Sequence, residues 1–305
     1  MKIYDTPLSL IGNTPLIRLY NIEKKYDLKC RLFAKLEKQN IFGSIKDRIA
    51  KSMIDDGFQK GVIDEDTTII EPTSGNTGVA LSAICAYYKL KLIIVMPESM
   101  SIERRRLMSM YGTKIILTPS KEGMTGAINK ANELKNKIEN SIILNQFENE
   151  ANPQIHFLTT GKEIYEDTDG KIDYFVSGIG TGGSISGISR FLKCKNNLIK
   201  IIGVEPQQSP FFTQGIKKTH RIQGIGPNLR PKTLEMSNID TIITIDENEA
   251  LAMVKTLAQE EALLMGISSC ANLCACIKIA KENNDKTIVT LFPDSGERYL
   301  SIFDD

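Results

Sequence analysis

The stretch Tyr174-Phe-Val-Ser-Gly-Ile-Gly-Thr-Gly-Gly-Ser184 places an apolar run directly before a glycine-rich loop. The residues from Ser184 to Cys194 then have the apolar spacing of a helix. A buried strand, a tight loop and a helix in this order are the unit from which parallel sheets are built, because the helix returns the chain to the start of the next strand. The stretch therefore predicts an α/β protein.

The same alternation runs through the 305-residue chain, a length that suits two lobes, each a mostly parallel twisted sheet covered by helices. The predicted strands are rich in Ile and Val and alternate little, as in strands covered on both faces. They are 31–35, 68–71, 92–96, 114–117, 142–144, 174–177, 200–204, 241–245 and 287–292. The predicted helices are 46–56, 77–88, 101–111, 123–140, 153–167, 184–194, 247–265 and 270–283. Residues 205–239, rich in Pro, Gly and Gln, are predicted to be a long loop lining a site.

Bulk composition excludes several classes of function. The net charge of +1 gives no basic field for nucleic acid or an anionic membrane surface, so neither is expected as a partner. No apolar run is long enough to span a bilayer, and Met1–Asp5 do not begin a signal peptide, so we expect a cytoplasmic protein.

The six cysteines and two histidines are candidate metal ligands or reactive groups. Most of the cysteines lie in apolar stretches, which favours reduced, buried thiols. Cys276 does not share a helix face with Cys270 and Cys274, so core packing is favoured and no metal is expected. His156 is expected to be structural, whereas His220, in the polar loop, is a candidate to approach the site.

The loop Gly178–Ser184 is suited to binding a phosphate. Backbone N–H groups at a helix N-terminus attract an anion, glycines let the backbone approach it, and Thr181 and Ser184 add hydroxyl donors. Gly178, Gly180 and Gly183 also satisfy G-x-G-x-x-G, with Glu205 about twenty residues further on. From these residues alone, a phosphate site, a nicotinamide site and a structural turn all remain open.

Two further loops carry candidate chemistry. Glu71-Pro-Thr-Ser-Gly-Asn-Thr-Gly78 lies between a strand and a helix, and its hydroxyl and N–H groups form either a carboxylate nest or a plain helix cap. Asn40-Ile-Phe-Gly-Ser-Ile-Lys-Asp-Arg48 places Lys46 at the start of a helix. Lys46 is either a solvated charge or an amine whose ammonium form is disfavoured by the helix N-terminus and a nearby Arg, as imine formation requires.

Taken together, these motifs resemble the cysteine synthase (O-acetylserine sulfhydrylase) and cystathionine β-synthase family, which are fold type II pyridoxal phosphate enzymes. The resemblance runs from about residue 7 to residue 302. Further agreeing stretches are Ile11-Gly-Asn-Thr-Pro-Leu16, Met96-Pro-Glu-Ser-Met-Ser-Ile-Glu-Arg-Arg105, Gln146-Phe147, Ala151-Asn-Pro-Gln-Ile-His156 and Ser295-Gly-Glu-Arg-Tyr-Leu300.

The resemblance implies a role for each matching residue. Lys46 would hold pyridoxal 5'-phosphate as an internal aldimine and act as the catalytic base. The other implied cofactor-binding residues are Asn76 at the ring hydroxyl, Gly180, Thr181, Gly182, Gly183 and Ser184 at the phosphate, and Ser268 at the pyridine nitrogen. The implied substrate-binding residues are Thr73, Ser74, Gly75, Thr77, Gln146 and Gly224.

The resemblance also implies the domains and the reaction. Residues 1–40 and 148–305 would form a larger domain that binds the cofactor phosphate. Residues 41–147 would form a smaller mobile domain that carries Lys46 and the carboxylate loop. The implied reaction is β-replacement through an aminoacrylate, making cysteine from O-acetylserine and sulfide. The alternative uses cysteine as donor and releases hydrogen sulfide, forming lanthionine, cystathionine or serine.

Two departures from the family pattern bear on substrate choice. Pro227-Asn-Leu-Arg230 stands where Ala-Gly-Phe is typical, and its Arg230 either attracts a second substrate carboxylate or points to solvent. Ile41-Phe42 stands where a Pro is usual before the lysine turn. By analogy we expect a homodimer, with small amino acids and sulfide or a thiol as substrates. The C-terminal tail of a serine acetyltransferase is a candidate partner, either as a second role or as the whole role of a non-catalytic relative.

Overall fold

The structure is a computed structural model that describes residues 3–99 and 102–303. The chain divides into two compact units. The smaller unit comprises Met1–Ile11 and Lys46–Ala151, and the larger comprises Gly12–Ile45 and Asn152–Asp305. Residues 3–11 thus group with the smaller unit, whereas the family resemblance implied that residues 1–40 belong to the larger domain. Ile45 stays with the larger unit because its N–H donates to the carbonyl of Pro293, at 2.9 Å.

The larger unit is built on a six-stranded sheet in the described residues, with strand order β1-β2-β10-β7-β8-β9. Strands β1 and β2 pair antiparallel, and every other pair is parallel. The strands are β1 (Leu16–Arg18), β2 (Arg31–Leu36), β7 (Tyr174–Gly178), β8 (Lys200–Pro206), β9 (Thr241–Ile245) and β10 (Thr287–Phe292).

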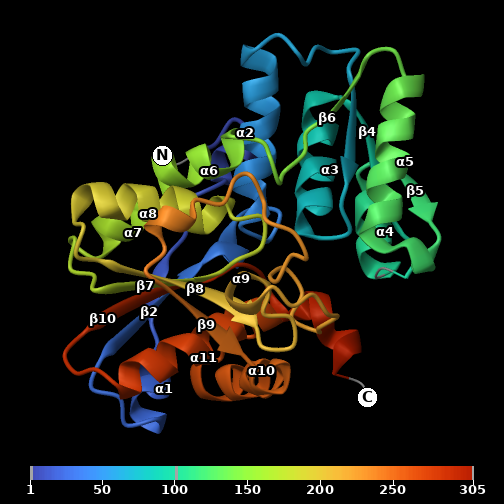
Figure 1. Cartoon of the computed structure of the whole chain (residues 1–305). Helices are drawn as coiled ribbons and strands as arrows, with labels where there is room; N and C mark the ends of the chain where they lie inside the picture. The colour runs from blue at the N-terminus through green and yellow to red at the C-terminus, as the bar shows by residue number, and fades with distance from the viewer. Residues whose placement is uncertain (1–2, 100–101, 304–305) are drawn as a thin grey trace. The chain divides into compact units, whose positions relative to one another are not determined.

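Helices cover both faces of this sheet. Figure 1 shows α7 and α8 on one face and α1, α10 and α11 on the other. The main helices are α1 (Tyr20–Lys25), α7 (Gly161–Asp167), α8 (Gly183–Lys195), α9 (Phe211–Gln214), α10 (Glu247–Glu261) and α11 (Ile267–Lys281). Helix α10 begins where Asp246 accepts hydrogen bonds from the N–H groups of Asn248 and Glu249, and it ends at Ala262, whose φ is +55°.

The smaller unit is built on a four-stranded parallel sheet in the described residues, with strand order β5-β4-β3-β6. The strands are β3 (Thr68–Pro72), β4 (Lys91–Pro97), β5 (Lys114–Thr118) and β6 (Ser141–Ile143). Helix α5 packs on one face and α3 on the other (Figure 1). The helices are α2 (Lys46–Gln59), α3 (Asn76–Tyr88), α4 (Ile102–Met110) and α5 (Gly123–Lys137). Helix α6 (Ala151–Ile155) begins at the last residue of this unit, and its other residues belong to the larger unit.

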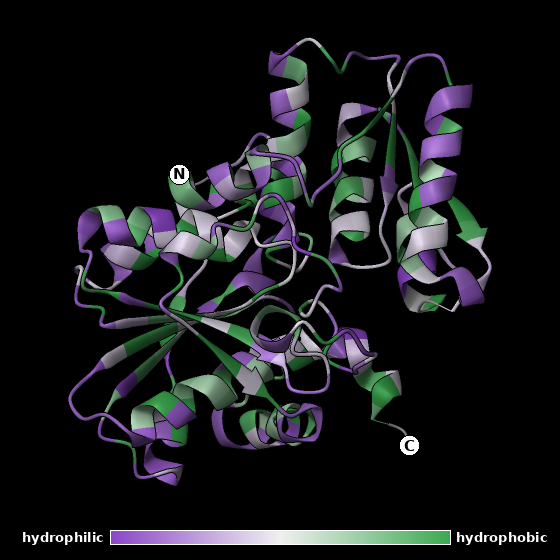
Figure 2. Cartoon of the chain, viewed as in Figure 1, coloured by the Kyte–Doolittle hydropathy of each residue, from purple (hydrophilic) through white to green (hydrophobic). Residues whose placement is uncertain are grey.

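The sheets are apolar and the surface helices are mixed in character. In Figure 2 the strands of the six-stranded sheet carry long hydrophobic stretches, and α5 alternates between hydrophobic and hydrophilic residues. All six residues of β10 are buried, as expected for a central strand covered on both faces. Among the described residues, no helix is both long enough and apolar enough to cross a lipid bilayer.

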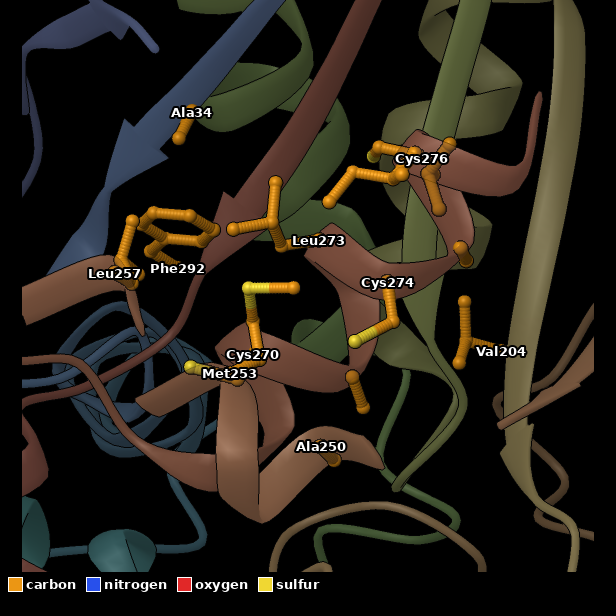
Figure 3. Close-up of a cluster of buried hydrophobic side chains, with 14 of the residues drawn as sticks. Ala34, Val204, Ala250, Met253, Leu257, Cys270, Leu273, Cys274, Cys276 and Phe292 are labelled. Atoms are coloured by element: carbon orange, nitrogen blue, oxygen red, sulfur yellow. The ribbon is translucent and has the colours of Figure 1, made fainter. Parts of the chain in front are cut away.

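Three cysteines of α11 belong to the core of the larger unit. Cys270, Cys274 and Cys276 are buried in the same hydrophobic cluster as Met253 and Leu273 (Figure 3). Burial raises the pKa of the Cys276 thiol to about 12, so it stays protonated and unreactive near neutral pH. These residues behave as small apolar side chains.

The predicted α/β architecture is confirmed. All nine predicted strands are present, because each is a short Ile/Val-rich run between turn residues. The predicted continuous helix 153–167 is wrong: a π-helical turn, His156–Thr160, separates α6 from α7. The predicted helix 101–111 is present from Ile102, and its first residue lies outside the described residues, as do two residues of the motif Met96–Arg105. Strand β1 and helix α1 were not predicted, being too short to show a period.

Candidate functional site

The loop Gly178–Ser184, here called the glycine loop, joins β7 to α8 in the larger unit. Gly182 precedes the helix with a φ of +86°, a conformation that glycine adopts without strain. The first intrahelical bond runs from the Ser186 N–H to the Gly182 carbonyl, at 3.0 Å. The N–H groups before Ser186 at this helix end therefore have no intrahelical acceptor, which suits them to an anion.

Close packing explains why the loop needs several glycines. A Cβ on Gly180 would lie 2.3 Å from the Gly224 carbonyl oxygen, and one on Gly183 would lie 1.9 Å from Oδ1 of Asn152. Both distances are far shorter than a van der Waals contact. The loop is thus held between Gly224 on one side and Asn152 on the other.

Two buried side chains fix the hydroxyl groups of the glycine loop. Asn152 Nδ2 donates to Thr181 Oγ1 at 3.1 Å. His156 Nε2 lies 3.0 Å from Ser184 Oγ, and its Nδ1 lies 2.9 Å from Thr160 Oγ1. The π-helical turn brings Thr160 to the ring, and such turns often occur at functional sites. The sequence predicts a structural role for His156, but its position five residues after Ala151 gives no sign of contact with the loop.

Replacing His156 with Ala is expected to weaken the glycine loop. Ser184 and Thr160 would both lose a buried partner, and each such loss costs about 1–3 kcal/mol. We expect the dissociation constant of the cofactor that the family resemblance implies to rise about tenfold and the thermal midpoint of unfolding to fall. Spectroscopic titration and calorimetry measure the two quantities. The matched control is Lys162→Ala, an exposed residue of α7 next to this turn. Unchanged cofactor affinity in the His156 variant would contradict this role.

Ser268 lies near Gly224, which packs against the glycine loop in the larger unit. It stands in the first turn of α11 and is 4% exposed. A Cβ on Gly224 would lie 3.8 Å from Ser268 Oγ, and the Gly226 N–H donates to the Ile179 carbonyl at 2.9 Å. The larger unit therefore brings Gly224, for which the family resemblance implies substrate binding, together with the glycine loop and Ser268, for which it implies cofactor binding.

The loop Glu71–Gly78, here called the hydroxyl loop, joins β3 to α3 in the smaller unit. Thr77 Oγ1 donates to Gln146 Oε1 at 2.7 Å, and both residues are at most 5% exposed. The Gly75 N–H donates to Thr73 Oγ1 at 3.4 Å. The smaller unit therefore brings Gln146 to the hydroxyl loop from 69 positions further along the chain.

Two more side chains complete this group. Asn76 is the first residue of α3, directly before Thr77. Arg104, on α4, donates from Nη1 to the carbonyl of Ser74 at 3.3 Å and is 8% exposed. Burial and this bond make Arg104 a support of the hydroxyl loop.

Lys46 is the first residue of α2. It is also the first residue of the segment Lys46–Ala151, which forms most of the smaller unit. The residues before it are fixed in the larger unit, where Ser44 forms an antiparallel bridge with Asp294. Asp47 and Arg48, which follow it, are 0% and 1% exposed. The turn at Lys46 is therefore not a solvated charged turn, because the two residues that follow Lys46 are buried.

The comparisons with known proteins identify the family. The model of the pyridoxal-phosphate dependent enzyme family matches residues 8–294. The chain belongs to this family. It is 46% identical over 301 residues to cysteine synthase B of Campylobacter jejuni, covering 99% of this chain and 98% of that protein.

Two solved structures of this family are similar to the chain in fold. The hydrogen sulfide-producing enzyme of Fusobacterium nucleatum has a TM-score of 0.94 at 42% identity, with coverage of 97% of this chain and 100% of that one. Cysteine synthase of Entamoeba histolytica has a TM-score of 0.95 at 38% identity, with coverage of 98% and 90%. The predicted family and its cofactor, pyridoxal phosphate, are thereby confirmed.

The residues present fit the cofactor of this pyridoxal-phosphate dependent enzyme. The glycine loop offers helix N–H groups and two oriented hydroxyls, those of Thr181 and Ser184, to a phosphate. The backbones of Gly180 and Gly224 approach so closely that a Cβ on Gly180 would collide with the Gly224 carbonyl oxygen. Ser268 offers a buried neutral hydroxyl near Gly224.

The divergent segment Pro227–Arg230 is part of the surface of the larger unit. Asn228 and Arg230 are exposed, and Asn228 Oδ1 accepts a hydrogen bond from Ser209 Oγ at 3.2 Å. His220 lies at the same loop, with Nε2 3.2 Å from the Gly226 carbonyl oxygen. Asn228 and His220 thus stabilise the loop that continues from Gly224, and Arg230 is left at its exposed end.

The second divergent segment, Ile41–Phe42, is held by the end of the chain. Arg298 Nη2 donates to the Phe42 carbonyl at 2.6 Å. Gly43 then takes a φ of +86°, and a Cβ there would collide with the same guanidinium group. The turn before Lys46 is therefore fixed by Arg298 without the proline that is usual in the family.

Proposed function

We propose that the chain makes cysteine from O-acetylserine and sulfide by pyridoxal phosphate-dependent β-replacement. The observation that carries the reaction type is the buried hydroxyl of Ser268 on the side of the glycine loop and Gly224. A neutral partner at the ring nitrogen gives a weaker electron sink than a carboxylate, which suits loss and addition at the β-carbon. The 46% identity to a cysteine synthase supports this choice of substrates.

The proposed binding roles are divided between the two units. In the larger unit, Gly180–Ser184 would hold the cofactor phosphate and Ser268 would bond its ring nitrogen. In the smaller unit, Asn76 would bond the ring hydroxyl, and Thr73–Thr77 with Gln146 would bind the substrate carboxylate. When bound, the cofactor supplies the aldehyde carbon that takes up the amino group and the ring that withdraws electrons.

Lys46 has the central catalytic role in this proposal. Its Nζ would hold the cofactor between turnovers and, once released by the incoming amino group, accept the proton from the substrate Cα. Burial of Asp47 and Arg48, which follow Lys46 in α2, restricts where the Lys46 backbone can move. The acetate of O-acetylserine would then leave, and sulfide would add at the same carbon.

A product screen by mass spectrometry tests the substrates. Purified protein loaded with the cofactor is given O-acetylserine, O-phosphoserine, serine or cysteine, each with sulfide or a thiol. We expect cysteine from O-acetylserine and sulfide at a rate about tenfold or more above every other pair. A faster reaction from another donor would replace O-acetylserine in this proposal.

A second candidate uses cysteine as donor and releases hydrogen sulfide, forming lanthionine, cystathionine or serine. The 42% identity to a hydrogen sulfide-producing enzyme and the exposed Arg230 at the end of the Gly224 loop favour it. Arg230 would bind the second carboxylate of an amino-acid nucleophile. Incubation with cysteine alone distinguishes the two, because only the second candidate gives brisk sulfide release.

The proposal also includes the compartment, the oligomeric state and a partner of the enzyme. We propose a cytoplasmic homodimer, by analogy with the related enzymes and with the prevalence of symmetric dimers. Docking of a serine acetyltransferase tail is proposed as a second role of the carboxylate site. A peptide that ends in a free Ile carboxylate should then compete with the amino-acid substrate.

A further inference from the structure

Glu71 is a buried carboxyl group in the smaller unit that the reaction itself does not use. It is the fourth residue of β3 and is 1% exposed. Its neighbour in register on β4 is the apolar residue Ile94. An ionised group in such a place is costly unless hydrogen bonds compensate for the lost water, so its partners should be specific.

Those partners are two successive backbone N–H groups. Asn145 donates to Glu71 Oε2 at 2.9 Å, and Gln146 donates to Oε1 at 3.2 Å. The ladder between β3 and β6 ends at the pair Ile70 and Ile143, so residues 145 and 146 have already left the sheet. Asn145 has a φ of +53°, which helps to direct both N–H groups toward one anion.

The same carboxyl group is therefore connected to the hydroxyl loop. Glu71 fixes the backbone of Gln146, and the side chain of Gln146 accepts the hydrogen bond of Thr77 at 2.7 Å. All three residues are at most 5% exposed. Displacement of the Gln146 backbone would consequently move an amide and a hydroxyl that the proposed function assigns to the substrate carboxylate.

We infer that Glu71 is a positioning residue for the substrate carboxylate, which holds Gln146 against Thr77 through the N–H groups of residues 145 and 146. The inference rests on the proposed function for the role of those two side chains. It assigns Glu71 no contact with substrate or cofactor.

The protonation of Glu71 gives this role a pH dependence. Burial raises the pKa of Glu71 to about 7, against the opposing effect of the two N–H groups of Gln146 and Asn145. No charged side chain of the described residues contributes to that shift. Above neutrality both oxygens accept charge-assisted bonds, whereas below it one oxygen carries a proton and holds its N–H less well.

The variant Glu71→Gln tests the inference, because an amide has the shape of the protonated carboxyl group. We expect KM for O-acetylserine to rise about tenfold at pH values above 7, with kcat within about threefold of the wild type. The ratio of the variant's KM to that of the wild type should fall toward one as the pH falls below about 7. Because both proteins see the same substrate, its own titration cancels in the ratio.

Glu150→Gln is the matched control, since it removes the same charge from an exposed position four residues after Gln146. Its KM ratio should stay near one at every pH. A KM ratio for Glu71→Gln that is near one above neutrality, or that does not change with pH, would overturn the inference. Wild-type turnover with O-acetylserine tests the proposed function separately, so the two can fail independently.

A second measurement needs no variant and no turnover. In ¹⁵N-labelled wild-type protein with its cofactor, the amide signals of Asn145 and Gln146 should titrate together, with a midpoint near pH 7. The exposed Glu150 amide should show no such step. Amide signals of both residues that are flat from about pH 5.5 to about 8.5 would contradict the inference even if Glu71→Gln failed to fold.

Discussion

Replacing Lys46 with Ala is expected to abolish turnover, with a loss of at least about 10³-fold. Alanine has no group that can accept the substrate Cα proton, and it cannot bond the cofactor covalently between turnovers. Lys46 is also the first residue of α2, so the change removes the amine without interrupting the helix. Rates are measured with saturating cofactor, together with the visible absorption band of the loaded protein, which should be lost.

Lys51→Ala is the control for the Lys46 variant. Lys51 lies on the same helix and pairs with Asp55 at its surface, so its loss should leave both rate and spectrum near those of the wild type. Thermal unfolding of the two variants checks that each is folded. A Lys46→Ala protein that retained turnover and the visible band would end the assignment of Lys46 as the catalytic lysine.

Gly180→Ala is expected to raise the dissociation constant of the cofactor by about 10- to 100-fold. The new Cβ would lie 2.3 Å from the carbonyl oxygen of Gly224, and neither backbone can yield without moving the other. Gly224 lies near Ser268, and Gly180 belongs to the loop that would bind the phosphate. The displacement should therefore weaken binding both at the cofactor's ring nitrogen and at its phosphate. Titration with pyridoxal phosphate, followed by absorbance, measures the change.

Gly215→Ala separates a steric effect from ordinary backbone strain. Gly215 has a φ of +72° in the same unit, and nothing lies within 4 Å of the position of a Cβ there. Its replacement strains the backbone at least as much as Gly180→Ala, but it does so away from the glycine loop. Equal loss of cofactor affinity in both variants would show that general destabilisation, and not the collision with Gly224, is responsible.

The strands and the loops between them were predictable from the sequence because their signals are local. Runs such as Thr287–Phe292 are apolar without alternation, and the glycine-rich and hydroxyl-rich loops follow such runs directly. The motifs around Lys46 and Ser268 could be placed through the family resemblance. Each of these signals lies within a few neighbouring residues.

The supporting contacts could not be predicted, because they join residues far apart in sequence. Asn152 and His156 reach the glycine loop from 29 and 28 positions away, and nothing in their local pattern indicates it. Glu71 stands in a motif whose hydroxyls draw attention, yet its partners lie 74 and 75 positions further on. The apolar spacing of the sequence does not reveal the π-helical turn at His156–Thr160, because the turn widens the helix only over these few residues.

The pairing of β2 with β10 governs the order in which the protein is able to fold during synthesis. Lys46–Ala151 is nearly the whole of the smaller unit, so its sheet is complete once one uninterrupted stretch has left the ribosome. In the larger unit, Arg31–Leu36 must wait for Thr287–Phe292, which lies between β2 and β7. The early strands of that sheet therefore stay unpaired on one edge through most of translation, and this interval is when they are most exposed to aggregation or chaperones.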